Sequence, residues 1–244
     1  MRAPHPPLRD YYTHEAERGG WVRQLFDRTA GDYDRIERVM ALGSGSWYRR
    51  RALSRAGLLS GMSVLDVGVG TGLTARQAAL LVGASGQVRG IDPSSGMIQM
   101  AKVPASVQLL LGSAEAIPAA SQSVDFLCMG YALRHIADMS AAFREFMRVL
   151  KPGGRICLME ITRPEGRAAR ALLKAYMRGV VPFLAGIVGE NADSPKLMRY
   201  YWDTIDACAP PNEILRAIRE AGFVEDYRFV VLGIFSEYCA RKPI

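Results

Sequence analysis

The stretch Val64-Leu-Asp-Val-Gly-Val-Gly-Thr-Gly-Leu73 is typical of a buried strand that ends in a glycine turn and leads into a helix. Three of its first four residues are apolar and strand-forming. The glycines of the turn allow backbone conformations, and a close approach of a ligand, that a Cβ would hinder. Turns of this kind bind many nucleotide-like ligands, so the stretch predicts such a site without identifying the ligand. The three glycines are Gly68, Gly70 and Gly72.

Downstream of Met62, short apolar strands alternate with helical segments, which predicts a parallel sheet with helices on both faces. We therefore expect an α/β fold with a doubly wound, mainly parallel, seven-stranded sheet. Its strands are expected near residues 63–67, 87–91, 107–111, 124–129, 154–161, 223–231 and 233–241. Its helices are expected near residues 72–82, 94–101, 138–150 and 211–221.

Helical regions are also predicted outside this alternating pattern. Residues 21–58 carry apolar side chains at helical spacing and no strand pattern, which predicts N-terminal helices. Residues from 165 to about 207 are mostly helical and longer than a standard crossover, so we expect a helical cap between the fifth and sixth strands. Residues 1–20 begin with several prolines and are expected to be a flexible lead. The rest, residues 21–244, should form a single domain.

The composition narrows the class of protein. The four cysteines are scattered without a Cys-x-x-Cys pair, which indicates neither a zinc site nor a disulfide framework. The longest apolar run of the C-terminal third, residues 179–189, is too short to span a membrane and contains Pro182. The N-terminus has no apolar signal core, so we expect a cytoplasmic protein. The net charge of +7 permits contact with anionic lipid or nucleic acid but is equally typical of an ordinary basic surface.

Two aspartates near the glycine turn favour one kind of cofactor. Asp92 ends the second strand about twenty residues beyond Gly72, where a carboxylate can accept hydrogen bonds from both hydroxyls of a ribose. Asp66, at the mouth of the turn, would repel a pyrophosphate but would complement the ammonium group of a methionine moiety. The turn itself is shorter than the Gly-x-Gly-x-x-Gly pattern of dinucleotide sites. These features favour S-adenosylmethionine over a nicotinamide dinucleotide.

Two later segments follow strands at the same edge of the predicted sheet. Ser113 and Ala114 follow the third strand, where backbone N–H groups and the serine hydroxyl could meet an adenine edge. Gly130 and Tyr131 follow the fourth strand, where a methyl donor and its acceptor would converge. Because the switch point of a doubly wound sheet lies between the first and fourth strands, these segments should share one crevice.

Three further motifs resemble those of a known family. The segment Arg148-Val-Leu-Lys-Pro-Gly-Gly-Arg-Ile-Cys-Leu-Met-Glu-Ile-Thr162 is close to the second signature of the ubiquinone/menaquinone biosynthesis C-methyltransferase family, with Thr162 in place of a serine. Gly130-Tyr-Ala-Leu-Arg-His135 resembles its Phe-Gly-Leu-Arg-Asn stretch. From about Val22 to the C-terminus the chain therefore resembles this family of class I S-adenosylmethionine-dependent methyltransferases, which have a Rossmann-like fold. The start of the first signature is matched by Phe26, Tyr33-Asp34 and Leu42-Gly43.

The chain also departs from that family, mainly in parts expected to face the substrate. Glu37 stands where the family has an asparagine, and Gly45 where it has a histidine. Ser113 replaces a common aspartate, and His135 replaces an asparagine. After the cap, residues 200–211 differ from the family's Ser-Ile-x-x-Phe-Pro region.

The resemblance implies methyl transfer from S-adenosylmethionine, with no metal ion, to a small and hydrophobic acceptor. A phenol or quinol ring carbon is the acceptor it implies, while O-, N- or S-methylation of another metabolite or lipid stays open. RNA methylation, and nucleic acid as a partner, are disfavoured because there is no appended RNA-binding module and no Asn-Pro-Pro-Tyr motif. The intact glycine turn disfavours a non-catalytic binding protein. Peripheral contact with the inner face of the membrane, through a helix containing Arg49 to Arg51, stays open, as does oligomerisation.

The candidate site residues come from these motifs. His135 is the candidate base, although it could equally be a packing histidine; Arg134 would polarise an oxyanion or form a structural ion pair. Tyr131 would line the site of methyl transfer. Tyr200, Tyr201 and Trp202 are either the aromatic wall of the acceptor pocket or a helix packed on the cap. The expected cofactor-binding residues, with Tyr33 implied by the resemblance, are Tyr33, Asp66, Gly68, Gly70, Thr71, Gly72, Asp92, Pro93, Met97, Ser113, Ala114 and Gly130.

Overall fold

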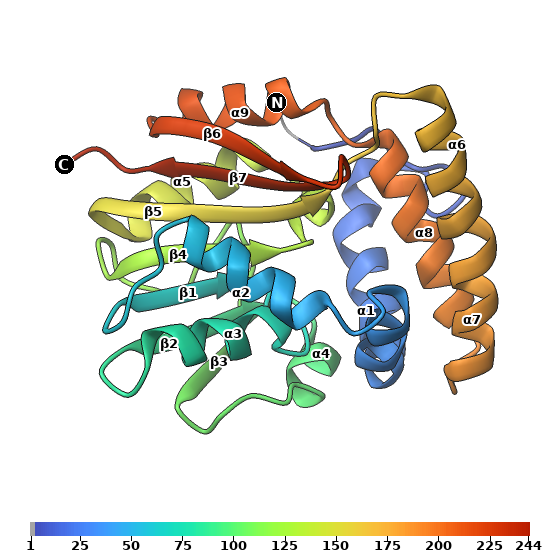
Figure 1. Cartoon of the computed structure of the whole chain (residues 1–244), viewed down its shortest axis with the longest axis horizontal. Helices are drawn as coiled ribbons and strands as arrows, with labels where there is room; N and C mark the ends of the chain where they lie inside the picture. The colour runs from blue at the N-terminus through green and yellow to red at the C-terminus, as the bar shows by residue number, and fades with distance from the viewer. Residues whose placement is uncertain (1–2) are drawn as a thin grey trace.

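The computed structural model describes residues 3–244, which form a sheet of seven strands with helices on both faces (Figure 1). The strands are β1 (Ser63–Val67), β2 (Gln87–Asp92), β3 (Val107–Leu111), β4 (Val124–Gly130), β5 (Leu150–Ile161), β6 (Val224–Val231) and β7 (Phe235–Arg241). Their order is β3-β2-β1-β4-β5-β7-β6. The first five run parallel, and β7 pairs antiparallel with both β5 and β6. This order confirms the predicted mainly parallel, doubly wound sheet.

Alternating side chains of the central strands build one apolar core on each face of the sheet. The helices that cover the two faces are α2 (Gly45–Arg55) with α3 (Leu73–Val82), and α5 (Met139–Val149) with α9 (Pro211–Glu220). Leu65 and Leu127 pack in the core with α5 and α9, whereas their neighbours Val64 and Phe126 pack in the core with α2 and α3. Successive side chains of a strand point to opposite faces, so strands buried on both faces are apolar throughout.

Most element boundaries lie close to those predicted, and β5 is the exception. It begins at Leu150 rather than near residue 154. The chain passes directly from α5 into β5, and a register shift between Val124 and Phe126 accommodates the Lys151-Pro-Gly-Gly154 segment. Helix α4 (Ser95–Gln99) is also shorter than predicted.

Helix α1 (Glu15–Met40) begins earlier than residue 21, where the sequence pattern places its start. The preceding segment, expected as part of a flexible lead, packs against the domain, because His5 and Tyr12 are both buried. The buried Arg18 donates to the Tyr12 hydroxyl at 3.1 Å and to the backbone oxygen of His5 at 3.0 Å. Hydrogen bonds of this kind leave no regular spacing of apolar residues in the sequence, so a search for helical periodicity does not reveal them.

The cap predicted between β5 and β6 is present and helical. It consists of α6 (Arg167–Ala175), the π-helical turn η2 (Tyr176–Val180), α7 (Val181–Val188) and α8 (Ser194–Ala207). In Figure 1 these helices stand beside α1 at one end of the sheet, at right angles to most of the strands. The cap and α1 together cover the edge where the parallel strands end.

Helices α6 and α7 form one continuous helical run with η2, which is longer than the apolar run of residues 179–189 that was expected to be too short to span a membrane. Pro182 lies in the first turn of α7, directly after the wider turn of η2, where a proline's missing N–H is tolerated. The run Arg167–Val188 is 22 residues long and, by length and composition alone, apolar enough to cross a membrane. Only 22% of that apolar window is buried, so most of the run faces outward.

Helix α1 is hydrogen-bonded both to the sheet and to the cap. Towards the sheet, Asp27 accepts a hydrogen bond from the Ser94 hydroxyl at 2.6 Å, at the start of α4. Towards the cap, Asp32 accepts one from the Ser194 hydroxyl at 2.8 Å, at the start of α8. The helix therefore fixes the cap over the carboxyl ends of the strands.

A buried ion pair joins the sheet to the cap from the inside. Arg134, in the turn after β4, pairs with Glu160 near the end of β5, and both side chains are fully buried. Arg134 Nε also donates to the Thr204 hydroxyl in α8 at 3.1 Å. The guanidinium lies 4.5 Å from the centre of the Tyr201 ring, also in α8. This ion pair therefore sets where α8 lies on the sheet.

Replacing Glu160 with glutamine should destabilise the fold strongly, because the buried Arg134 guanidinium then lacks its countercharge. We expect the free energy of unfolding, measured by urea titration, to fall by about 3–5 kcal/mol. Adding Arg134→Met to Glu160→Gln should restore much of that stability, since an apolar side chain needs no countercharge. A loss smaller than about 1 kcal/mol in Glu160→Gln, the size typical of an exposed pair, would contradict this role.

Candidate active site

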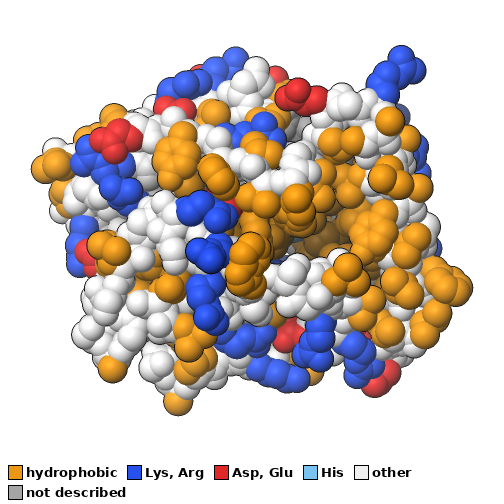
Figure 2. All heavy atoms as spheres, viewed as in Figure 1, with side chains coloured by type: hydrophobic (Ala, Val, Ile, Leu, Met, Phe, Trp, Pro, Cys, Tyr) orange, Lys and Arg blue, Asp and Glu red, His pale blue; other side chains and the backbone are white. Residues whose placement is uncertain are grey.

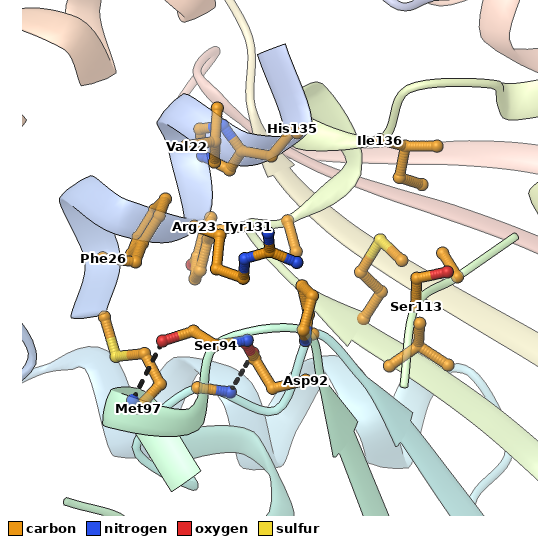
Figure 3. A pocket seen from close by; sticks show the side chains of 18 of the residues that line it. Val22, Arg23, Phe26, Asp92, Ser94, Met97, Ser113, Tyr131, His135 and Ile136 are labelled. Carbon is orange, nitrogen blue, oxygen red and sulfur yellow. Dashed lines mark hydrogen bonds between the residues drawn. The ribbon is translucent and has the colours of Figure 1, made fainter. Parts of the chain in front are cut away.

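A cavity of about 280 Å³ lies at the carboxyl ends of β1, β2 and β4, next to α1 (Figure 3). β1 lies between β2 and β4 in the sheet, so this is the switch point at which doubly wound sheets bind ligands. The volume is just below the range of about 300–1,000 Å³ that is usual for small-molecule sites. The predicted cofactor-binding residues that line the cavity are Tyr33, Gly68, Gly70, Asp92, Pro93, Met97, Ser113, Ala114 and Gly130.

Asp92 lies on the cavity wall and holds the glycine turn in place. Its Oδ2 accepts a hydrogen bond from the Gly70 N–H at 2.8 Å, and its Oδ1 accepts one from the Ser94 N–H at 2.9 Å. Burial raises the pKa of Asp92 to about 6, and the two backbone hydrogen bonds oppose that rise. Each carboxylate oxygen has a further lone pair, so Asp92 can still accept hydrogen bonds from two sugar hydroxyls.

The glycine turn brings bare backbone to the cavity. Gly68 and Gly70 line it and have φ angles of 69° and 54°, a region that favours glycine. A Cβ on Gly68 would lie only 2.6 Å from the Ala132 Cβ, so no larger side chain fits there. This geometry supports a ligand that contacts the backbone of the turn.

Thr71 and Gly72 are predicted cofactor-binding residues that belong to the turn but do not line the cavity. The Thr71 hydroxyl donates to Asp34 of α1, which ties the turn to that helix. Gly72 caps α3 with a φ of 88°, and a Cβ there would come within 2.2 Å of Val103. The two residues shape the turn from outside the cavity.

Asp66 is also absent from the cavity lining, although the sequence places it at the mouth of the turn. Strand alternation explains the difference, because Asp66 points to the same face as Val64, beneath the start of α3. It is fully buried and accepts a hydrogen bond from the Cys128 thiol at 3.6 Å. Its Oδ2 has no hydrogen-bond partner within residues 3–244, and burial raises its pKa to about 7. In this structure the Asp66 carboxylate is therefore buried outside the cavity.

The cavity combines polar anchors with apolar surface. Ser94 and Ser113 contribute hydroxyls, and Met97 and Ile136 contribute apolar side chains (Figure 3). The Ser94 hydroxyl also accepts a hydrogen bond from the Met97 N–H at 3.0 Å, which caps α4. With Asp92, this lining fits a ligand that joins a sugar to a flat base, as S-adenosylmethionine does.

Aromatic side chains and one histidine form the other end of the cavity. Tyr33, Tyr131, Tyr201 and His135 all line it. His135 Nδ1 lies 3.3 Å from the Tyr200 hydroxyl, and His135 Nε2 is buried without a partner in the described part of the chain. Burial, and then the charge of Arg134, lower the pKa of His135 well below its usual value, so the ring is neutral.

Arg134, Tyr200 and Trp202 lie behind this wall and do not line the cavity. Arg134 sits behind Tyr201, engaged with Glu160. Tyr200 and Trp202 flank Tyr201 on α8, and each residue of a helix is rotated by about 100° from the one before, so three consecutive side chains cannot share one face. Of the predicted aromatic wall, only Tyr201 reaches the cavity.

One face of α1 contributes cavity residues that the sequence interpretation missed. Gly19, Val22, Arg23 and Phe26 all line the cavity, and Figure 3 shows the Arg23 guanidinium extending into it. Their spacing of three, four and seven residues from the first places them on one side of a helix. That spacing is the signal that could have identified them.

Within residues 3–244, no group of three or more His, Cys, Asp or Glu could hold a metal ion.

Comparisons with a family profile and with known sequences all point to the same methyltransferase family. The sequence profile of the ubiE/COQ5 methyltransferase family matches residues 12–242. The demethylmenaquinone methyltransferase of Symbiobacterium thermophilum is 32% identical over 236 residues, which cover 93% of this chain and 94% of that protein. The ubiquinone/menaquinone biosynthesis C-methyltransferase UbiE of Campylobacter jejuni is 28% identical over 231 residues, covering 91% of this chain and 97% of that protein.

Solved structures share the fold. A SAM-dependent methyltransferase from Aquifex aeolicus has a TM-score of 0.62 at 21% identity, over 86% of this chain and 97% of that one. The Haemonchus contortus phosphoethanolamine N-methyltransferase 2, solved in complex with S-adenosyl-L-methionine, has a TM-score of 0.58 at 18% identity, over 81% of this chain and 52% of that one. These likenesses support the class I methyltransferase fold.

Binding of S-adenosylhomocysteine should depend on pH through Asp92. Ribose hydroxyls donate to the ionised carboxylate, so the ligand binds the ionised form more tightly. Because the pKa of Asp92 is raised to about 6, affinity should be constant well above that pH and should fall as pH drops through it. Well below pH 6 the affinity should fall by about tenfold per pH unit, which calorimetry at several pH values can measure.

Two variants serve as controls for this pH dependence. Asp92→Asn should bind weakly with no inflection near pH 6, because position 92 then has no carboxyl and Asp66, whose pKa is raised to about 7, does not line the cavity. Asp66→Asn should keep the inflection, because Asp66 does not line the cavity. An unchanged pH profile in Asp92→Asn would assign the titration to another group.

Proposed function

The chain belongs to the ubiE/COQ5 methyltransferase family and is an S-adenosylmethionine-dependent methyltransferase, and we propose that it methylates a ring carbon of a small phenol or quinol. The observation that carries this proposal is the aromatic end of the cavity. The His135 ring lies 5.3 Å from the Phe26 ring and 5.7 Å from the Tyr201 ring, measured between centres. Such a wall suits a flat ring that bears a hydroxyl. The names of the menaquinone and ubiquinone methyltransferases that the chain resembles support the same acceptor class.

His135 is suited to activate such a ring. When bound, the cofactor supplies an electrophilic methyl group. With its proton on Nδ1, towards the Tyr200 hydroxyl, His135 leaves Nε2 free to accept a hydrogen bond from the acceptor hydroxyl. That bond raises electron density at the neighbouring ring carbon. Because the pKa of His135 is well below its usual value, the ring polarises the hydroxyl without taking up its proton. The hydrogen that the methyl group displaces from the ring carbon leaves as a proton to solvent, and the product of the cofactor is S-adenosylhomocysteine.

Arg134 acts on the acceptor only through other residues. Its charge adds to the effect of burial in keeping His135 neutral, and its guanidinium packs against the Tyr201 ring that lines the cavity. We therefore assign Arg134 a positioning role instead of the direct contact suggested by the sequence. Phe26 and Tyr201 exclude water from the acceptor end, which favours an in-line transfer.

We place this activity in the cytoplasm, at the periphery of the inner face of the membrane. Quinols with apolar tails reside in membranes, and the chain has a net charge of +7 that favours anionic lipid. The acceptor is then a small hydrophobic molecule, and nucleic acid is not a partner.

The acceptor atom can be tested with S-adenosylmethionine carrying a ¹³C-labelled methyl group. Purified enzyme is incubated with a panel of phenols and hydroquinones, and the products are examined by NMR. We expect a methyl group bonded to a ring carbon next to a hydroxyl. A methoxy product would favour O-methylation, for which the hydroxyl held by His135 is the natural nucleophile, and transfer only to amines or thiols would contradict the proposal.

Substitutions of His135 should separate hydrogen bonding from packing. His135→Leu should lower kcat by at least about a hundredfold, because the acceptor hydroxyl loses its partner. His135→Asn keeps a hydrogen-bonding group and should retain more activity. Neither change should alter affinity for S-adenosylhomocysteine by more than about twofold, since His135 lies at the far end from Asp92.

The pH profile of kcat provides an independent check on His135. The pKa of His135 lies well below its usual value, so its titration should produce no inflection between about pH 6 and pH 8. An inflection in that interval that disappears in His135→Asn would show that the imidazole is protonated during turnover. Unchanged kcat in His135→Leu would remove it from the mechanism.

A further inference from the structure

A second cavity, of about 180 Å³, adjoins the first one. Three segments surround it: the turn between α1 and α2, the end of α6 with η2, and the turn between β6 and β7. Its lining is mainly apolar and includes Met40, Leu173, Met177 and Phe235. In Figure 2 a hollow bordered by hydrophobic side chains lies in this region, between α2 and α6.

Three tyrosines form the wall between the two cavities. Tyr33, Tyr131 and Tyr201 line both of them. The Tyr33 and Tyr201 hydroxyls are hydrogen-bonded at 2.6 Å. Tyr131 has a φ of 63°, a left-handed conformation that residues other than glycine rarely adopt. Only the side chains of these tyrosines therefore separate a molecule in the second cavity from the first cavity.

Two buried polar groups of the second cavity have no partner. Arg49 is buried and pairs with Glu37 at 2.7 Å, yet its Nε donates to no group within residues 3–244. The hydroxyl of Tyr48, which is also buried, makes no hydrogen bond of good geometry in that range, although burial and the nearby Glu237 carboxylate raise its pKa. Both residues line the cavity. Leaving buried polar groups unpaired is costly, so the inner end of the cavity fits an oxygen-bearing group, while the remainder fits an apolar one.

The mouth of the cavity carries some of the most exposed apolar side chains of the chain. Trp47 (62% exposed) and Leu232 (84%) line the cavity, and Leu42 (90%) and Leu172 (75%) are the sequence neighbours of its lining residues Ala41 and Leu173. We call these four residues the rim. Exposed apolar side chains that gather at one place indicate a contact surface, whereas scattered ones do not. The outward-facing apolar run Arg167–Val188 extends the same surface along α6 and α7.

Basic side chains accompany the rim. Arg50 and Arg51 of α2 and Lys174 of α6 are exposed, and within residues 3–244 no acidic group lies within ion-pair distance of them. The Arg51 guanidinium lies 5.7 Å from the centre of the Trp47 ring. Figure 2 shows Lys and Arg side chains in a row beside the hollow. An apolar rim with unpaired positive charges is complementary to an anionic lipid surface.

We propose that the second cavity is the acceptor chamber and that its rim docks on an anionic lipid surface, from which an amphiphilic acceptor enters ring first. One ring oxygen then meets Arg49 and Tyr48, while the apolar tail stays between the rim residues. Opening of the Tyr33–Tyr201 hydrogen bond brings the ring to the first cavity, where its second oxygen reaches His135. The identity of the ring rests on the proposed function; the chamber and the docking surface do not.

Docking can be tested by sedimentation of the full chain with vesicles. Phosphatidylcholine vesicles containing phosphatidylglycerol should bind the chain, and pure phosphatidylcholine vesicles should bind it far more weakly. The double variant Leu42→Ser/Leu232→Ser should weaken binding by at least about tenfold, because two exposed leucines no longer enter the lipid. Each of Arg50→Gln and Arg51→Gln should weaken it by about fivefold.

Matched controls lie away from the rim. Leu59 and Leu80 are each 63% exposed, so Leu59→Ser/Leu80→Ser makes the same chemical change on a smaller exposed apolar surface than Leu42 (90%) and Leu232 (84%) present, and it should leave binding unchanged. Arg144→Gln, on α5, is the control for charge. Equal losses in control and rim variants would overturn the docking surface. So would a dimer in solution that the rim variants dissociate, together with no vesicle binding, because the rim would then join two copies of the chain.

The chamber can be tested by direct binding of decyl-hydroquinone to the protein saturated with S-adenosylhomocysteine. Leu173→Trp should fill the chamber and weaken this binding at least tenfold, with unchanged thermal stability and unchanged affinity for S-adenosylhomocysteine. Leu173→Ala keeps the chamber open and should still bind. If Leu173→Trp lowers thermal stability, Met40→Trp tests the same space from α1. Wild-type affinity for decyl-hydroquinone in a stable, filled variant would overturn the chamber.

Different results would contradict the proposed function and the proposed acceptor chamber. Vesicle and decyl-hydroquinone binding that respond as expected, without methylation of any ring, would contradict the proposed function and support the chamber. Ring methylation that is equal in wild type, rim variants and Leu173→Trp would support the proposed function and overturn the chamber.

Discussion

Helix α1 is held by carboxylates that face in opposite directions, and both cavities depend on this arrangement. Asp27 and Asp34 bind groups at the carboxyl ends of the strands, and Asp32 binds the start of α8. Hydrogen bonds to charged groups contribute about 1.5–3 kcal/mol each, so together they place the helix firmly. The same helix provides Phe26 to the first cavity and Tyr33 to the wall between the two. Sheet, cap and site are therefore assembled around one element.

Burial of charge determines the chemistry of the donor and acceptor ends. At the donor end, burial raises the pKa of Asp92, which a ligand that donates hydrogen bonds would reverse. At the acceptor end, the buried Arg134 is neutralised by Glu160 but still lowers the pKa of His135. A histidine held neutral can accept a hydrogen bond from a phenol at any physiological pH. Burial of the ring and, after it, the charge of Arg134 therefore both lower the pKa of His135, and the ion pair that fixes the cap holds that charge in place.

Some site residues could be predicted because a local backbone constraint identifies them. Gly68 and Gly70 need conformations that favour glycine, and Asp92 ends a strand at a fixed distance from them. Asp66 could not be placed in this way. Its position at the end of β1 is evident, but whether its side chain faces the ligand or the helix depends on the strand register. The aromatic wall predicted from consecutive residues on α8 was wrong in part for a similar reason, because the rotation between successive helical residues leaves only Tyr201 facing the cavity.

The sequence by itself determined the sheet, its helices, the cap and the donor site, because apolar periodicity and glycine turns are local properties. It also determined the family, because motifs are read along the chain. Only the tertiary structure decided that α1 lines the donor cavity, that Arg134 pairs with Glu160 behind the wall, and that a second apolar cavity opens beside the first. These features join segments far apart in the chain, and the side chains that form them are selected by packing and burial, which no local pattern records.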